Sequence, residues 1–249
     1  MLRAVLFDLD DTLFDHRVCA RTALTTLHEA YDALRSRPFE EVARLHAGFL
    51  EELHVRVTSG ELPLEQARRE RFRRLFAAIG VTPSEEDVAE AAETYRGGYM
   101  KIRRAIAGAA ELLAAVKERS QVGIVSNNLL EEQQGKLRQC GLDRFVDELV
   151  VSEEARVSKP DPRIFQIALE RLGRRASEVV MVGDSWAADV IGARAAGIRA
   201  IWFNPQHLPP PEPGAGVVEL YSLEPVGQAL ATILAAHEEA RPATRLDGY

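Results

Sequence analysis

The short stretch "VLFDLDDTLF" places three carboxylates, Asp8, Asp10 and Asp11, within four positions directly after an apolar run. Carboxylates this close together repel one another unless they lie in water or a cation neutralises them. A hard divalent cation such as Mg²⁺ prefers oxygen ligands of this kind. A carboxylate can also act as a nucleophile toward phosphorus, and a second acid nearby can supply and accept a proton. The stretch is therefore either an acidic surface turn or part of a metal-dependent catalytic site.

Five short apolar segments predict buried strands. They are nearly continuous apolar runs, which is typical of strands that are covered on both faces of a parallel sheet. Helix-length stretches separate the last four, and each stretch ends in a glycine that suits a left-handed C-cap. The alternation predicts an α/β fold with a doubly wound, Rossmann-like parallel sheet. The predicted strands cover residues 4–8, 122–126, 148–152, 179–183 and 199–203, and the helices between the last four cover residues 129–141, 161–173 and 185–197.

The region between the first two predicted strands breaks this alternation. It is rich in Ala, Leu, Glu and Arg, and it predicts helices over about 16–34, 39–57, 64–79 and from 85 onward, with no strand. The simplest account is an all-helical domain inserted into the core after the first strand. The predicted organisation is an α/β core of residues 1–14 and 101–240, a helical cap of residues 15–100, and a flexible tail of residues 241–249.

Polar residues gather where the predicted strands end. In a parallel sheet the carboxyl ends of the strands lie at one edge, and ligands bind outside that edge. A turn of hydroxyl and amide groups, one lysine and several carboxylates suit a phosphoryl group that is bound together with a metal. Taken singly, each residue is also compatible with an ordinary turn or surface position. The residues expected at this edge are Asp8, Asp10, Ser126, Asn127, Asn128, Lys159, Asp184 and Asp189.

Four motifs, in this order, resemble the haloacid dehalogenase-like (HAD) hydrolases, in the branch with a helical cap inserted after the first strand. The motifs are "FDLDDTL" (7–13), "VSNN" (125–128), "SKPDPRIF" (158–165) and "GDSWAAD" (183–189). The resemblance implies a phosphatase, because family members that cleave carbon–halogen or carbon–phosphorus bonds typically lack an acid at the position of Asp10. The acidic fourth motif likewise implies a metal. Asp11 stands where many relatives have glycine, and we expect it to be a turn residue without a chemical role.

The same resemblance implies a role for each motif residue. Asp8 would attack phosphorus, and Asp10 would protonate the leaving oxygen and later activate water. Ser126 and the amide of Asn127 would hold phosphate oxygens, while Lys159 would offset the charge of the nucleophile and the phosphate. The implied Mg²⁺ site consists of Asp8, the backbone carbonyl of Asp10 and Asp184, with Asp189 supporting the metal either directly or from outside its ligand set.

The substrate is expected to be a small phosphorylated metabolite, a phosphomonoester. The stretch "SGELPLEQARRERF" (59–72) resembles part of the cap of house-cleaning nucleotidases and N-acylneuraminate 9-phosphate phosphatases, which favours a nucleoside monophosphate or a sugar phosphate. In the family the cap meets the leaving group. Arg56, Tyr95 and Arg96 are candidates for that contact, and each is also compatible with a plain surface position. The alternatives are a phosphosugar mutase of the β-phosphoglucomutase type, a noncatalytic binding or regulatory protein, and a 2-haloacid dehalogenase.

Composition narrows the partners and the location. The chain has 249 residues, which suffice for a core domain with an insertion, and its two cysteines lie in no metal-binding spacing. The net charge of −7 disfavours binding to nucleic acid or to an anionic membrane. The first residues do not resemble a secretory signal, and no apolar run approaches the about 20 residues that span a bilayer. We therefore expect a cytoplasmic, Mg²⁺-dependent enzyme that is a monomer or a homodimer.

Overall fold

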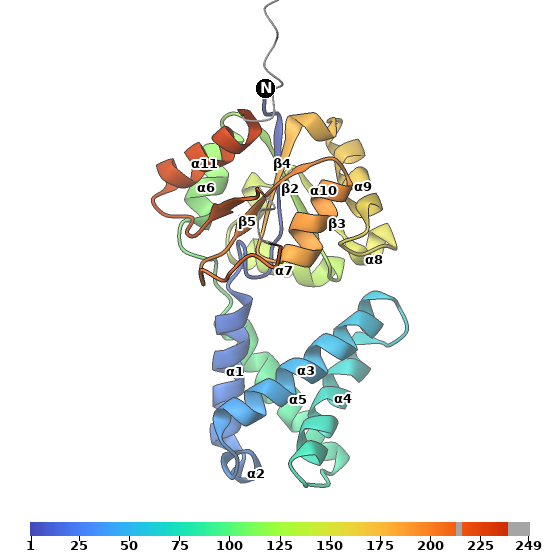
Figure 1. Cartoon of the computed structure of the whole chain (residues 1–249). Helices are drawn as coiled ribbons and strands as arrows, with labels where there is room; N and C mark the ends of the chain where they lie inside the picture. Colours follow the sequence, from blue (N-terminus) through green and yellow to red (C-terminus); the bar gives the residue numbers. More distant parts are fainter. Residues whose placement is uncertain (213–215, 239–249) are drawn as a thin grey trace, which may run out of the picture. The chain divides into compact units, whose positions relative to one another are not determined.

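The computed structural model describes residues 1–212 and 216–238, so the predicted tail of residues 241–249 lies outside the described part. The chain divides into two compact units, one formed by Met1–Phe14 with the chain from Ala105 onward, the other by Asp15–Arg104 (Figure 1). The expected boundary at 101 falls at the end of a helix, whereas the units divide after Arg104. Arg104 belongs with the helical unit because its guanidinium donates to the Asp15 carboxylate at 2.7 Å.

The α/β unit contains a sheet of six parallel strands in the order β3-β2-β1-β4-β5-β6. The predicted doubly wound parallel sheet is therefore confirmed. β1 lies at the centre, where its four residues are fully buried between β2 and β4. The sequence did not predict β6, whose three residues are too few for a clear apolar pattern. The strands are β1 (Ala4–Phe7), β2 (Gln121–Ser126), β3 (Glu148–Val151), β4 (Val179–Gly183), β5 (Arg199–Phe203) and β6 (Val218–Leu220).

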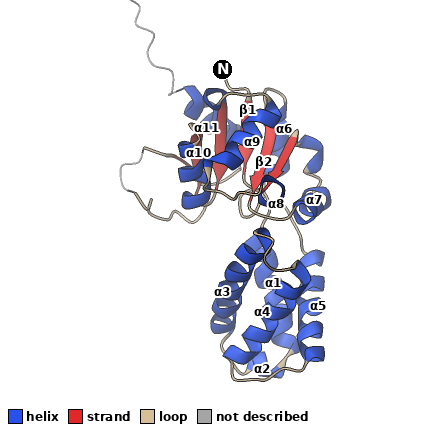
Figure 2. Cartoon of the chain, turned by 90° about the vertical axis from the view of Figure 1, so that its right-hand side faces the viewer, coloured by secondary structure: helices blue, strands red, loops and turns tan. Residues whose placement is uncertain are grey.

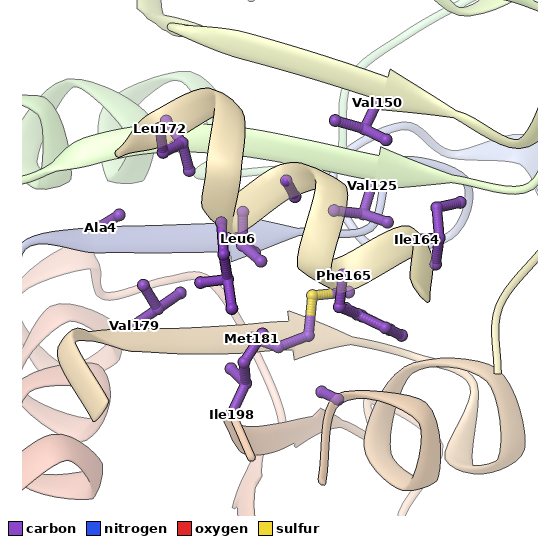
Figure 3. Close-up of a cluster of buried hydrophobic side chains, with 13 residues drawn as sticks. Ala4, Leu6, Val125, Val150, Ile164, Phe165, Leu172, Val179, Met181 and Ile198 are labelled. Atoms are coloured by element: carbon purple, nitrogen blue, oxygen red, sulfur yellow. The ribbon is translucent and has the colours of Figure 1, made fainter. Parts of the chain in front are cut away.

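Helices cover both faces of this sheet, α6 and α11 on one side and α9 and α10 on the other (Figure 1). α9 begins with the Asp161 side chain accepting from the Arg163 N–H and ends at Gly173 in the left-handed conformation, as the sequence predicts. Side chains of α9 such as Phe165 pack on Leu6 and Met181 of the central strands (Figure 3). The helical elements of this unit are α6 (Ala109–Lys117), α7 (Leu130–Gln139), η1 (Asp143–Phe145), α8 (Ser152–Ala155), α9 (Pro162–Leu172), η2 (Ala176–Glu178), η3 (Trp186–Ile191), α10 (Gly192–Ala195) and α11 (Val226–Glu238).

The prediction of a single helix over residues 185–197 is wrong. The segment forms a π-helix, η3, followed by the short α10. The Ser185 hydroxyl begins η3 by accepting from the Ala188 N–H at 3.2 Å. In this wider turn the Asp189 carboxylate accepts from the Ser185 N–H at 2.9 Å, and a Cβ at Gly183 would lie only 2.3 Å from the same carboxylate oxygen. Gly183 therefore lets Asp189 approach the end of β4 closely.

The second unit is entirely helical (Figure 2). α1 packs on α5 and α3 packs on α4, around an apolar cluster that includes Leu27, Phe72 and Ala91. The predicted helix over 16–34 is divided, because Tyr31 is extended between α1 and α2. Ser84 and Asp87 form a reciprocal capping box at the start of α5. The helices are α1 (His16–Ala30), α2 (Asp32–Arg35), α3 (Phe39–Thr58), α4 (Leu64–Ala78) and α5 (Glu85–Lys101).

No helix in the described part of the chain combines the length and the apolar character needed to cross a membrane.

Candidate active site

Asp8 follows the last residue of the central strand β1. Its backbone N–H donates to Val182 on β4 at 2.9 Å, which continues the strand pairing by one residue and fixes the position of the carboxylate. The residue is only 6% exposed. β1 lies between β2, which ends at Ser126, and β4, which ends at Gly183. Asp8 is therefore placed in the middle of the edge at which the sequence analysis expects the site.

Lys159 brings two of the predicted carboxylates together. Its buried ammonium lies 2.5 Å from Asp8 Oδ1 and 2.7 Å from Asp189 Oδ1, and it donates to the Val125 carbonyl at 2.9 Å. Asn127 holds the lysine backbone, because its Oδ1 accepts from the Lys159 N–H at 2.7 Å and its Nδ2 donates to the Lys159 carbonyl at 2.9 Å. These two hydrogen bonds hold the loop before α9 against the residue that follows β2, and the Lys159 side chain points to Asp8.

The charges of this cluster shift the proton affinities of its members. Burial raises the pKa of Asp8 well above its usual range, against the effect of Lys159, and the nearby Asp189 and Asp184 raise it further. Burial by itself lowers the pKa of Lys159, but the charges of Asp189 and Asp8 outweigh it and hold the pKa above its usual range. Lys159 is therefore an ammonium group, and it lies among the carboxyl groups of Asp8, Asp184 and Asp189.

A group of three carboxylates, Asp8, Asp184 and Asp189, offers oxygen atoms that all lie within 4.8 Å of one another. Oxygen-only ligands and an excess of negative charge suit a hard divalent cation such as Mg²⁺. The half-buried Asp184 is held by its backbone, since its N–H donates to Thr12 Oγ1 at 3.1 Å and its carbonyl accepts from Trp202 Nε1 at 2.8 Å. The residues present therefore fit the metal that the sequence predicts.

A second charged cluster surrounds Asp10. Its carboxylate accepts from Lys136 Nζ at 2.6 and 2.8 Å, from Gln133 Nε2 at 2.9 Å and from Asn128 Nδ2 at 3.3 Å. Gln133 Nε2 also donates to Ser126 Oγ at 2.6 Å. Asp10 and Ser126 are thereby linked through one amide group. Asp11 has a left-handed backbone with φ of 62° in the turn that follows, so the prediction of a turn residue is confirmed.

The sequence analysis did not single out Gln133 or Lys136. Both lie in the predicted helix over 129–141, three residues apart, and Leu137, four residues after Gln133, is buried with them. Side chains three or four residues apart share a face of a helix, so the pattern places a glutamine and a lysine on the apolar face. Polar residues on a buried face are the signal that could have identified them.

Tyr95, one of the three candidates for contact with a leaving group, is neither a surface residue nor open to solvent. It is 5% exposed and packs against His46 and Phe72 in the core of the helical unit. Arg56, another of the candidates, forms an exposed ion pair with Glu61 at 2.9 Å.

Comparison with known proteins identifies the family. Residues 2–197 match the family model of the haloacid dehalogenase-like hydrolases. The chain is 30% identical over 228 residues to pyrimidine 5'-nucleotidase YjjG of Escherichia coli (strain K12), which covers 91% of this chain and 96% of that protein. It is 31% identical over 207 residues to ribulose-1,5-bisphosphate 5-phosphatase of Halopiger xanaduensis, covering 82% and 86% of the two chains.

A solved structure agrees with these relatives. The magnesium-bound crystal structure of the HAD-hydrolase YfnB from Bacillus subtilis superimposes with a TM-score of 0.73 at 26% identity, covering 92% of this chain and 99% of that chain. The chain belongs to the haloacid dehalogenase-like hydrolases, as the motifs predicted, and the protein is a hydrolase.

Proposed function

We propose that the protein is a Mg²⁺-dependent phosphatase, which hydrolyses the phosphomonoester of a small metabolite through an aspartyl-phosphate on Asp8. The observation that carries this proposal is the position of Asp8 at the end of β1, 2.5 Å from the Lys159 ammonium and among carboxylates that suit a metal. Relatives whose names describe a nucleotidase and a sugar bisphosphate phosphatase support the same chemistry.

The first half of the proposed reaction forms the covalent intermediate. An Asp8 oxygen attacks phosphorus and forms a new O–P bond, while the bond from phosphorus to the ester oxygen breaks. Asp10 enters this step as the protonated carboxylic acid and gives its proton to that leaving oxygen, which departs as an alcohol while Asp10 becomes a carboxylate. Lys159, already an ammonium group beside Asp8, offsets the negative charge of the phosphoryl group in the transition state.

The second half restores the enzyme. Asp10, now a carboxylate, takes a proton from a water molecule as that water attacks phosphorus, and the bond from phosphorus to Asp8 breaks. Phosphate leaves and Asp8 is free for another cycle. Ser126 and the backbone N–H of Asn127 are proposed to hold the phosphoryl oxygens through both halves, since they lie at the end of β2 beside Asp8.

Magnesium is proposed to be held by Asp8, by Asp184 and by the backbone carbonyl of Asp10. When bound, Mg²⁺ supplies positive charge to the phosphate oxygens. Asp189 uses Oδ1 to accept from Lys159 and Oδ2 to accept from the Ser185 N–H. Because both of its oxygens are engaged, we propose that Asp189 supports the metal site from outside the ligand set, by orienting Lys159 and the start of η3.

A substrate screen tests the proposal. Purified protein with Mg²⁺ is incubated with nucleoside monophosphates, sugar phosphates and phosphorylated organic acids, and released phosphate is measured. We expect turnover of at least one nucleoside monophosphate or sugar phosphate, and loss of turnover when EDTA removes the metal. Transfer to sugar that depends on a bisphosphate activator would favour a mutase, and release of halide from a 2-haloacid would favour a dehalogenase. Absence of all three activities would favour a binding protein.

The proposed setting of this reaction is the cytoplasm. The net charge of −7 and the small phosphorylated substrates expected for the site argue against nucleic acid or membrane surfaces as partners.

A further inference from the structure

Two polar side chains of α7 are buried beside the catalytic edge without a role in the chemistry proposed so far. Gln133 is 0% exposed and Lys136 is 3% exposed. A buried ammonium group is strongly unfavourable unless it is paired with an acid. The partner of Lys136 is Asp10, the residue proposed to move the proton in both halves of the reaction. The burial of Lys136 is therefore compensated by its ion pair with Asp10, the proposed catalytic acid.

The Lys136 ammonium contacts both oxygens of Asp10, at 2.6 and 2.8 Å. It also lies 5.2 Å from the centre of the Phe14 ring, which favours a cation over its face. Gln133 and Asn128 donate to the second Asp10 oxygen, at 2.9 and 3.3 Å. With one carboxylate held by three side chains, Asp10 has little freedom to rotate.

The Gln133 amide connects the Asp10 carboxylate to the Ser126 hydroxyl, which is proposed to hold a phosphate oxygen. Its Nε2 donates both to Asp10 and to Ser126 Oγ, the latter at 2.6 Å. Among the described residues its buried Oε1 has no hydrogen-bond partner, and the reversed amide would set Oε1 against the Asp10 carboxylate. Because Ser126 Oγ accepts from Gln133, the hydroxyl proton of Ser126 remains available to donate to a phosphate oxygen.

We propose that Lys136 and Gln133 are positioning residues, which hold Asp10 where it can transfer a proton to the leaving oxygen and tie that position to the Ser126 hydroxyl. This inference rests on the proposed phosphatase function. No proton passes to or from Lys136 in this scheme. Its ammonium stabilises the carboxylate that Asp10 becomes as the proton moves to the leaving oxygen, and so favours that transfer. Its effect is exerted through Asp10, so its loss should matter most where the leaving oxygen needs that proton.

The choice of leaving group separates positioning from general structural support. A 4-nitrophenolate ion leaves readily without protonation, whereas an alkoxide does not. For Lys136→Met we expect kcat/KM for an alkyl phosphate to fall about 10²- to 10³-fold, within the range of general acid catalysis, and kcat/KM for 4-nitrophenyl phosphate to fall less than about 10-fold. Asp10→Asn should show the same pattern more strongly. The alkyl phosphate used for this comparison is the substrate with the highest turnover by the wild-type protein in the screen described above.

The matched control is Lys117→Met. Lys117 pairs with Asp147 on the half-exposed surface of the same unit, and Asp147 accepts from Val122 near the start of β2, whereas the proposed catalytic residues lie where the strands end. Its ratio of kcat/KM for the two substrates should equal that of the wild type. The ratio compares two substrates in one sample, so it does not depend on the fraction of folded enzyme, which thermal unfolding reports separately.

Three outcomes count against the inference. Equal losses for both substrates in Lys136→Met would reduce Lys136 to a structural role, and an unchanged ratio with full activity would remove any role. Wild-type protein that hydrolyses neither substrate would overturn the phosphatase proposal itself, and the positioning proposal with it. A wild type that hydrolyses both substrates, combined with equal losses in the variant, overturns the positioning proposal alone.

Discussion

The edge of the sheet and the helical unit differ in how their charged side chains are paired. At the edge of the sheet, Asp8, Lys159 and Asp189 are buried and paired, although 151 residues separate Asp8 from Lys159. In the helical unit, ion pairs such as Arg73 with Glu70 and Glu85 are local and largely exposed. Buried charge is costly and exposed ion pairs contribute little to stability. The contrast agrees with the proposal that the charges at the sheet edge serve the chemistry of the site.

The helical unit has buried polar groups of a different kind. The Arg71 guanidinium lies 4.7 Å from the centre of the Tyr95 ring and 4.9 Å from that of Phe72, and no carboxylate pairs with it among the described residues. His46 packs against the same two rings. Here aromatic faces, and not carboxylates, surround the cation. Four variants, considered from the largest expected effect to the smallest, test the difference between the two units.

Asp8→Asn should have the largest effect. Asparagine is similar in size but cannot form the acyl phosphate, so we expect phosphatase activity to fall to the background of the assay while the fold is retained. Phosphate release measures the activity, and acid-stable labelling by a ³²P-labelled substrate measures formation of the acyl phosphate. Asp143→Asn, at the exposed start of η1, is the control and should keep full activity. Unchanged activity in Asp8→Asn would refute the aspartyl-phosphate mechanism.

Lys159→Met should follow, with losses in both activity and stability. It leaves Asp8 and Asp189 buried without their common cation, which is expected to reduce the free energy of unfolding by about 3–5 kcal/mol. Activity should fall by about 10²- to 10³-fold, because a charge that stabilises the transition state is lost. Chemical denaturation in EDTA measures the stability. Lys117→Met, which removes a half-exposed pair of the same unit, should cost far less, and equal costs would contradict the contrast between buried and exposed ion pairs.

His46 predicts a smaller, pH-dependent effect in the helical unit. Burial, with the nearby charges of Arg71 and His16, lowers the pKa of His46 well below its usual range. The unfolded chain protonates this histidine near its usual pKa of about 6.5, so below that pH the unfolded state binds more protons than the folded state. The stability is therefore complete above about pH 6.5 and is lost progressively as the pH falls, by at most about 1.4 kcal/mol per pH unit from this group.

His46→Leu should remove that component of the pH dependence. Denaturation curves collected between neutral and acidic pH, for the variant and the wild type, give the difference. His54→Leu, on the same helix α3, leaves His46 in place and should keep the wild-type dependence. If His46→Leu and the wild type lose stability in parallel as the pH falls, His46 is not buried as a neutral imidazole.

Arg73→Gln should have the smallest effect. It removes the 2.7 Å pair with Glu70 and the 2.8 Å pair with Glu85, and Glu85 is 74% exposed. Exposed pairs contribute about 0.2–1 kcal/mol each, and salt screens them. A double-mutant cycle with Glu85→Gln, repeated at high salt, measures the interaction. A coupling as large as the loss in Lys159→Met would show that the surface pairs of the helical unit stabilise it as the buried pairs stabilise the sheet edge.

Much of the site could be predicted because its residues follow strands. Asp8 continues β1, Ser126 ends β2 and Asp184 follows β4, so the parallel sheet brings them to one edge. Lys159 does not directly follow a strand. It was expected at this edge because it lies in "SKPDPRIF", the third of the four motifs that resemble the family. Gln133 and Lys136 were missed because they belong to a helix, and a helical pattern by itself does not show which neighbour its buried face meets.

The parts of the fold that were missed have a similar explanation. β6 has three residues and α6 is a short, nearly apolar helix, so neither shows the periodicity on which prediction relies. The π-helix η3 differs from an α-helix by its hydrogen-bond spacing and its wider turn, and Asp189, which is hydrogen-bonded to Ser185 and Lys159, lies within it. Such a local change depends on contacts with residues distant in the chain.

The sequence by itself determined the class of fold, the helical insertion and the set of carboxylates with one lysine, because apolar runs, glycine ends and ordered motifs are local patterns. Only the tertiary structure decided how the charges are shared. Lys159 forms ion pairs with Asp8 and Asp189, and Lys136 forms an ion pair with Asp10. The physical reason is that a buried ion needs a partner within a few ångströms, and which residues come that close is set by packing between distant segments.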